Sequence, residues 1–210
     1  MTNLWMLRPI PHGHNQMQYF LSHNRIAVGY PLDTNLQNFS QQEIRNKIRE
    51  VDASWETGIN NIEKIVYLMQ KGDIVIVPEQ NARDVYFAEI VSDYIYEPDL
   101  DKNDVVGSGF PHQREVLWYF DKKPFPRNEL PDALTKSLRF PGATAELTKH
   151  LPLVAEIIGN TDLMQQMQTT TLSFEHLYDK ALQVVEEALE SRDQNIALKA
   201  AEIVLNYSKV

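Results

Sequence analysis

Residues 73–91 read DIVIVPEQNARDVYFAEIV, and here the sequence changes from a helical to a strand-like period. The first part, Asp73 to Val77, is mostly apolar and β-branched and stops at Pro78, which predicts a buried strand. A polar turn follows, and Val85 to Val91 is again rich in apolar residues. Two such segments joined by a short turn predict an antiparallel β-hairpin.

The flanking sequence predicts further strands with helices between them. The segment Ser40-Gln-Gln-Glu43 is a capping box that opens one helix, and a second helix is expected over residues 60–71, with Gly72 as its C′ residue. Alternation of short strands, hairpins and helices predicts an α+β fold around a barrel-like sheet. The other expected elements are strands at 4–10, 25–30 and 114–120 and a short helix at 130–138.

The character of the chain changes after about residue 150, which predicts a body over 1–150 and a helical C-terminal extension over 151–210. Residues 159–171 are polar and are expected to join the two parts. Ser191-Arg-Asp-Gln194 is predicted to be a second capping box between two helices. Their apolar stripes comprise Leu177, Ala181, Val184, Val185, Ala188 and Leu189, and Ile196, Ala200, Val204 and Tyr207.

A two-helix hairpin cannot bury both of its faces alone. Ile203, Val204 and Leu205 are consecutive, so they point around more than half of the second helix. We therefore expect residues 173–210 to contact a second copy of the chain or an effector protein as well as the body. The alternative is a helix sandwiched entirely within one chain.

Composition limits the classes of partner. The chain of 210 residues has no cysteine, a net charge of −9 and no apolar stretch of the roughly 20 residues that cross a bilayer. Its opening, MTNLWMLRPIP, lacks the basic start and apolar run of a signal peptide, so we expect a cytoplasmic protein. The acidic balance argues against tight, sequence-independent DNA binding, which needs many phosphate contacts. It leaves open a shaped pocket for one flipped base.

Several segments occur in an order typical of a known family. They are Trp5-Met-Leu-Arg8, Trp55-Glu-Thr-Gly-Ile-Asn-Asn61, a helix ending Tyr67-Leu-Met-Gln-Lys-Gly-Asp73, and the strand after it. In this order, residues 3–140 resemble the EVE domain family, a PUA-like branch related to YTH-type readers of modified bases. The chain departs from the family in two places: one extra residue separates Trp55 from Gly58, and Asn60 stands where the family has arginine.

Two further segments, Arg25 to Tyr30 and His112 to Trp118, are similar to N-terminal domains of McrB-type restriction systems. The resemblance implies a PUA-like mixed β-barrel with flanking helices. It also implies a non-enzymatic module without a cofactor that recognises a modified base in DNA or RNA, in restriction or phage defence.

Reading a flipped base requires aromatic faces for stacking and a few polar groups for the base edge. We expect Trp5, Tyr30, Trp55 and Asn61 to surround one cleft, with Tyr94 or Tyr96 at its rim. A tryptophan in a strand is more often core, and an asparagine can equally cap a helix. The candidate base-binding residues are Trp5, Arg8, Tyr30, Trp55, Asn61, Tyr94 and Tyr96, and the candidate phosphate-binding residue is Arg114.

Other motifs lack residues that a functional site would need. His12-x-His14 lacks a third metal ligand at suitable spacing, and Val91 stands where a nuclease with Asp84 and Glu89 would need lysine. Two alternatives to a base reader remain: a protein-interaction scaffold that acts through its C-terminal helices, and an enzyme acting on nucleotides. A reader needs an open aromatic cleft near Arg or Lys, a scaffold would have that cleft filled, and an enzyme needs two convergent titratable groups.

Overall fold

The computed structural model describes residues 2–103, 105 and 107–207, with the side chains of all of these except 168, 170–175 and 207. Contacts divide the chain into two compact units, Met1–Ile158 and Gly159–Val210. We call the first unit the body and the second the helical hairpin. The division falls later than the predicted boundary after residue 150, because helix α5 (Leu151–Ile158) belongs to the body.

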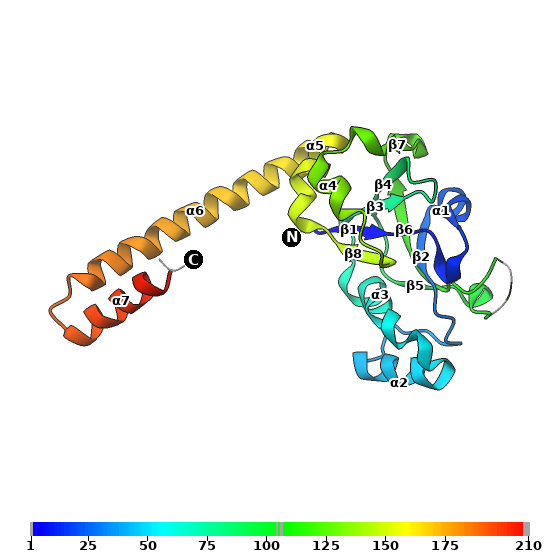
Figure 1. Ribbon diagram of the computed structural model, residues 1–210, viewed down its shortest axis with the longest axis horizontal. Coiled ribbons are helices and arrows are strands. Elements are labelled where there is room, and N and C mark those ends of the chain that lie inside the picture. Colours follow the sequence, from blue (N-terminus) through cyan, green and yellow to red (C-terminus); the bar gives the residue numbers. More distant parts are fainter. Residues whose placement is uncertain (1, 104, 106, 208–210) are drawn as a thin grey trace. The chain divides into compact units, whose positions relative to one another are not determined.

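The body is built on a mixed, open and curled β-sheet (Figure 1). The strand order is β2-β6-β4-β3-β1-β8, with β5 beside β6 and β7 beside β4. Only the β1–β3 pair is parallel among the described strands. The α+β class is confirmed, but the sheet ends at β2 and β8, so the expected barrel is not closed over the described residues. The strands are β1 Leu4–Leu7, β2 Arg25–Val28, β3 Ile74–Pro78, β4 Asp84–Ile90, β5 Ile95–Tyr96, β6 His112–Trp118, β7 Phe125–Pro126 and β8 Thr144–Glu146.

The predicted hairpin is present as β3 and β4, paired antiparallel with Val77 opposite Tyr86. Its turn is held by Asn81, whose side-chain oxygen accepts hydrogen bonds from the amides of Arg83 (2.8 Å) and Asp84 (3.1 Å). Every residue of β3 is buried, while β4 alternates over most of its length. Both strands are interior to the sheet, so β3 is covered on its two faces over its whole length, whereas part of β4 stays partly accessible.

Most predicted helices are present, with different ends. Ser40 and Glu43 form the predicted capping box at the start of α2 (Gln41–Val51). α3 (Ile59–Glu63) continues into a π-helical turn, Lys64–Leu68, and ends there, so Gly72 lies in the following turn with φ +86° rather than at the helix end. α1 (Met17–His23) was not predicted, and α4 (Asp132–Ser137) falls within the expected helix.

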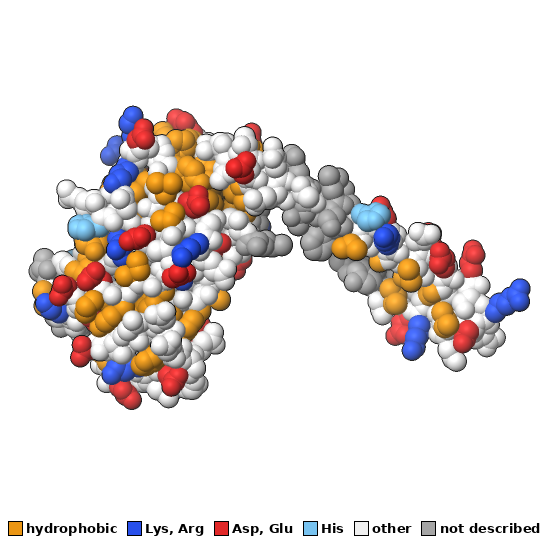
Figure 2. Space-filling model, turned by 180° about the vertical axis from the view of Figure 1, so that it is seen from behind, with side chains coloured by type: hydrophobic (Ala, Val, Ile, Leu, Met, Phe, Trp, Pro, Cys, Tyr) orange, Lys and Arg blue, Asp and Glu red, His pale blue; other side chains and the backbone are white. Residues whose placement is uncertain are grey.

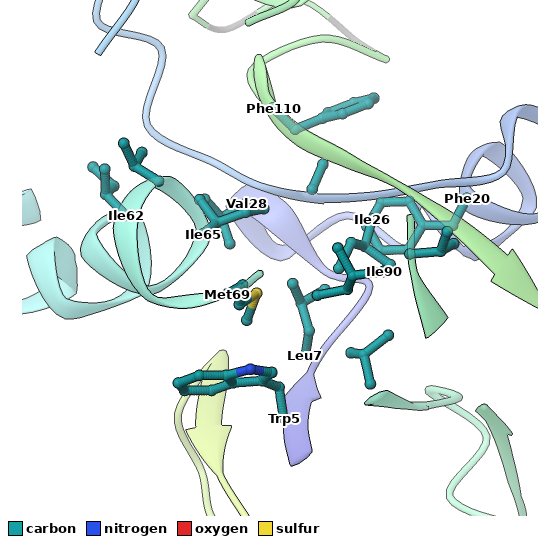
Figure 3. Packing of buried hydrophobic residues seen from close by; sticks show 14 of the residues in the cluster. Trp5, Leu7, Phe20, Ile26, Val28, Ile62, Ile65, Met69, Ile90 and Phe110 are labelled. Carbon is teal, nitrogen blue, oxygen red and sulfur yellow. The ribbon is translucent and has the colours of Figure 1, made fainter. Parts of the chain in front are cut away.

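The core of the body gathers apolar side chains from the sheet and from α1, α2 and α3. Figure 3 shows part of this cluster, including Trp5, Phe20, Ile65 and Phe110. Phe20 and Phe110 are fully enclosed, and Trp5 is only 3% exposed. The aromatic residues of the chain therefore divide into core members and those that remain available at the surface.

The helical hairpin consists of α6 (Thr161–Leu189) and α7 (Gln194–Tyr207). The polar joint expected over 159–171 is helical from Thr161 onward. The side-chain oxygen of Asn160 accepts a hydrogen bond from the Leu163 amide (2.9 Å) and caps the start of α6. The second predicted capping box is also displaced. Asp193, not Ser191, accepts the amide of Asn195 (2.9 Å) in the first turn of α7. The predicted stripe position Tyr207 has a side chain outside the described residues.

None of the described helices is both long enough and apolar enough to cross a bilayer.

Candidate nucleic-acid interface

A cleft of about 230 Å³ opens in the body where the end of β2 meets the loop after β1. Three rings line it, those of His12, Tyr30 and Trp55, together with Arg8. The remaining lining residues are Ile10, Pro11, Ala27, Val28, Gly29 and Ala143. Three of the predicted site residues, Arg8, Tyr30 and Trp55, thus lie around one hollow.

The three rings are tilted against one another. The centroids of His12 and Trp55 are 5.4 Å apart at 58°, and those of Tyr30 and Trp55 are 6.0 Å apart at 77°. A sandwich around a planar ligand would need two parallel rings roughly 7 Å apart, twice the carbon contact distance of about 3.5 Å. The cleft therefore offers single aromatic faces with a ring edge beside them, and not the paired faces that base reading was expected to use.

Arg8 supplies the positive charge of the cleft. Its guanidinium donates to the carbonyl oxygens of Leu138 (3.1 Å), Phe140 (2.7 Å) and Gly142 (3.3 Å). These bonds tie the end of β1 to the loop between α4 and β8. They hold the charge at one wall of the cleft, so a ligand would meet a fixed guanidinium.

Tyr30 is held in an uncommon backbone conformation. Its φ is +73°, a left-handed value that is rare for a bulky residue and doubly restricted before Pro31. Its amide donates to Nε2 of His12 (3.2 Å), and its carbonyl accepts from Nε2 of His112 (3.0 Å). Two histidines, His12 in the turn after β1 and His112 at the start of β6, therefore fix the backbone that aims the Tyr30 ring.

His112 is completely enclosed, and burial lowers its pKa to about 4, so the ring is neutral at pH 7. Because Nε2 donates to the Tyr30 carbonyl, Nδ1 is the acceptor for the Tyr94 hydroxyl at 2.7 Å. Burial also raises the pKa of Tyr94. Tyr94 therefore supports the cleft from the interior and does not reach its rim, and it is absent from the lining.

Tyr96 likewise lies away from the cleft. Its ring is 6.2 Å from that of His112, and its hydroxyl donates to Asp101 at 2.6 Å. Burial raises the pKa of Tyr96, and its hydrogen bond to Asp101 raises that pKa further. The expectation that Tyr94 or Tyr96 borders the cleft is therefore wrong in geometry.

Glycines provide the space that these rings occupy. A Cβ atom at Gly58 would lie 1.8 Å from the Tyr30 hydroxyl oxygen, and one at Gly29 would lie 3.0 Å from Nε2 of His12. Gly109, with φ +87°, would place a Cβ 2.9 Å from the same histidine ring. The Trp55-to-Gly58 segment thus has a direct packing role, since Trp55 lines the cleft and Gly58 admits Tyr30.

Asn61 positions Tyr30 and does not line the cleft. Its side-chain nitrogen donates to the Tyr30 hydroxyl (3.1 Å), and its side-chain oxygen accepts from the Thr144 hydroxyl (2.7 Å). The amide therefore connects α3, the end of β2 and β8. Its base-edge role would require these two bonds to be replaced.

Trp5 and Arg114 are structural residues. Trp5 is 3% exposed and donates from its indole nitrogen to Asp73 at 2.7 Å, so it cannot stack on a ligand in the cleft. Arg114 is 4% exposed and donates to three backbone carbonyls, those of Ile65 (2.7 Å), Val66 (3.1 Å) and Ser92 (3.1 Å). Burial lowers its pKa. The geometry does not support the expected phosphate contact of Arg114, because its donors are bonded to carbonyls of the π-helical turn and of Ser92 inside the body.

His12 is the cleft residue that the sequence analysis missed. In the sequence it stands out only beside His14, as half of an incomplete metal motif, and no group of three metal-binding side chains occurs among the described residues. Its partner Tyr30 lies 18 residues away in the sequence. The only local signal is Pro11-His-Gly13, a turn in which His12 takes φ +50°.

Comparison with known proteins places the body in one family and gives no activity. No curated protein matches the chain. An NMR structure of Rpa0253 from Rhodopseudomonas palustris, a structural genomics target, is 16% identical, with a TM-score of 0.34 over 75% of this chain and 94% of that chain. A family model described as a domain of unknown function, DUF8426, matches residues 8–139, more than half of the 210 residues. The chain therefore belongs to the DUF8426 family.

Proposed function

We propose that this protein binds nucleic acid without catalysing a reaction, and that it holds one modified, unpaired base in the cleft of His12, Tyr30 and Trp55. The observation that carries the proposal is the open aromatic wall beside the fixed guanidinium of Arg8. The resemblance of residues 3–140 to EVE domains supports the same function. A restriction or phage-defence role for the recognition of modified DNA or RNA follows from that resemblance.

The dimensions of the cleft suit a small planar ligand. Its volume of about 230 Å³ lies below the roughly 300–1,000 Å³ of sites for drug-sized molecules. Stacking of one base on an aromatic side chain contributes roughly 1–3 kcal/mol and tolerates any base, so modification-dependent discrimination must come from the cleft walls.

The alternatives have less support. A scaffold would fill this cleft with its own side chains, yet the hollow is open. An enzyme would need convergent acid and base groups, but no carboxylate belongs to the described lining and the His12 Nε2 accepts the Tyr30 amide. The open hollow favours a binding cleft over a scaffold, and the described lining without a carboxylate favours binding over catalysis.

Tryptophan fluorescence provides a direct test. Trp5 and Trp118 are 3% and 7% exposed, whereas Trp55 lines the cleft, so a base in the cleft should quench mainly Trp55. Single-stranded and duplex oligonucleotides carrying one methylated or hydroxymethylated base are titrated against matched unmodified strands. We expect quenching with at least one modification and no quenching in a Trp55→Phe variant.

Affinity is measured in parallel by anisotropy of labelled oligonucleotides. Trp55→Ala should weaken binding of the preferred strand roughly 5- to 150-fold, the equivalent of 1–3 kcal/mol. Tyr178→Ala, which removes an aromatic side chain that is 63% exposed in the helical hairpin, serves as the matched control. Equal binding of all modified and unmodified strands, or full affinity in Trp55→Ala, would contradict the proposal.

A further inference from the structure

A second and larger hollow, of about 740 Å³, lies in the body. Three arginines line it, Arg83, Arg127 and Arg139, with Asn128 and Thr135 as neutral polar neighbours. We call it the arginine groove. Its volume falls within the roughly 300–1,000 Å³ of ligand sites in proteins.

Three separate elements bring these arginines together. Arg83 lies in the β3–β4 turn, Arg127 follows β7, and Arg139 follows α4. β7 pairs with the start of β4, and the Arg127 amide donates to the Arg83 carbonyl at 2.7 Å. The convergence is thus a product of the sheet and is not visible as a basic run in the sequence.

The three guanidinium groups have no ion pair with any described carboxylate. By contrast, Arg25 and Arg45 are paired with Glu115 and Glu63 at 3.0 and 3.2 Å. The groove lining contains a single acid, Asp84, and it accepts a hydrogen bond from Asn81 at 2.6 Å.

Three arginines without an ion pair to a described carboxylate thus line one hollow in a chain with a net charge of −9. On the face of the molecule drawn in Figure 2, Lys and Arg side chains are interspersed with Asp and Glu. Burial, and then the charges of Arg8 and Arg139, lower the pKa of Arg127. The groove is therefore a local site of mutual repulsion between cations, which a bound anion would relieve.

We propose that the arginine groove is a binding site for phosphate groups. Arginine presents a planar fork of donors that matches phosphate oxygens in pairs, and three such forks suit a ligand with several phosphates. A nucleic-acid strand and a free polyphosphate share this chemistry. The choice of a strand rests on the function proposed above.

Arg8 connects the groove to the aromatic cleft. It lines the cleft and donates to the Leu138 and Phe140 carbonyls, which flank Arg139 on both sides. A strand with its phosphates in the groove would thus pass a residue that belongs to the cleft. In this arrangement the groove binds the sugar-phosphate backbone of the strand, and the cleft binds one of its bases.

The test uses ligands without bases, so that it does not depend on base reading. A labelled single strand of abasic sugar-phosphate units and inorganic tripolyphosphate are titrated against the full-length protein at several salt concentrations. We expect R83Q/R127Q/R139Q to bind the abasic strand at least about tenfold more weakly, with the slope of log K against log salt reduced by about 2, since each lost phosphate contact contributes about 0.7 for a single strand.

Arg192→Gln is the matched control, because it removes one exposed positive charge from the helical hairpin. R83Q/R139Q, which alters only the two exposed arginines, is measured alongside in case the triple variant unfolds. Loss of strand binding in the groove variants alone supports the proposal and the strand as the source. Groove-dependent binding of tripolyphosphate without strand binding supports the phosphate site and contradicts the nucleic-acid function. Wild-type protein that binds neither ligand, or variants with unchanged affinity and salt slope, would overturn the proposal.

Discussion

At the scale of single residues, the cleft depends on how Tyr30 is held. His12 and His112 form hydrogen bonds with its strained backbone, and Asn61 forms one with its hydroxyl group. Backbone strain of this kind costs of order 1–3 kcal/mol and persists only where the surroundings determine it. The residues that bond Tyr30 therefore affect the shape of the cleft even where they do not line it.

Gly58 is the most sensitive of these surrounding positions. Alanine there would place its Cβ 1.8 Å from the Tyr30 hydroxyl, so Gly58→Ala should lower the free energy of unfolding by about 1–3 kcal/mol. Urea denaturation measures this loss. In a Tyr30→Ala background the clash is gone, and the same Gly58 substitution should cost less than half as much. Equal costs in the two backgrounds would show that Gly58 does not serve to accommodate Tyr30.

His112 makes stability depend on pH. Its pKa is lowered by burial from 6.5 to about 4, so the unfolded chain takes up a proton near pH 6.5 that the folded chain resists. Its contribution to stability is complete above pH 6.5 and is lost as the pH falls to 4. At about 1.4 kcal/mol per pH unit, the loss is roughly 3 kcal/mol.

The measurement compares wild type with His112→Gln, whose amide can still donate to Tyr30 and accept from Tyr94. Free energies of unfolding are determined by urea denaturation at about pH 7.5 and pH 4, a range that spans the shifted pKa. We expect wild type to lose about 3 kcal/mol more than the variant over this range. If wild type and the variant lose the same free energy of unfolding, groups other than His112 take up the protons.

At the scale of elements, the helical hairpin has more apolar surface than its own packing uses. Val185 and Ala188 of α6 are partly buried, and Ala200 of α7 is 3% exposed. Small residues at the contact let the helices approach closely. Other apolar side chains of the two helices stay exposed, including Leu177, Tyr178, Leu182, Val184, Ile196, Leu198, Ile203 and Leu205; Figure 2 shows orange side chains along the surface of this unit.

We therefore predict that the hairpin takes part in assembly. Leu198 and Leu205 are 68% and 60% exposed, and L198E/L205E should convert the wild-type assembly into a monomer of 24.3 kDa. Light scattering after size exclusion, over a range of concentrations, measures the mass. Asn206→Glu, which adds a negative charge at an exposed position of the same helix, should leave the mass unchanged. Wild-type protein that is monomeric at every concentration, with no other protein bound, would contradict the prediction.

At the scale of the whole molecule, net charge opposes nucleic-acid binding outside the groove. A chain with a charge of −9 repels the phosphate backbone, and few phosphate contacts can be made at once. We expect weak binding to unmodified duplex DNA at physiological salt, in the range of roughly 10⁻⁴ M or weaker. Anisotropy with a plain labelled duplex at about 150 mM salt measures it. Tight binding under these conditions would reveal a basic surface much broader than the arginine groove.

Local sequence determined the elements that depend on neighbours in the chain. The β3–β4 hairpin follows from the apolar runs on either side of a polar turn, and the start of α2 follows from Ser40 and Glu43. The α+β class follows from their alternation. Weaker local signals left α1 and β8 unpredicted, since short elements are stabilised mainly by tertiary packing.

Only the tertiary structure decided which candidate residues meet. Trp5 and Trp55 are equally plausible in the sequence, but the parallel β1–β3 pairing encloses Trp5 while the turn before α3 leaves Trp55 at the cleft. Arg114 was expected at a phosphate and instead bonds carbonyls inside the body, whereas Arg83, Arg127 and Arg139 converge from three elements. Burial and convergence depend on contacts between residues far apart in the chain, and a sequence read locally contains no record of those distances.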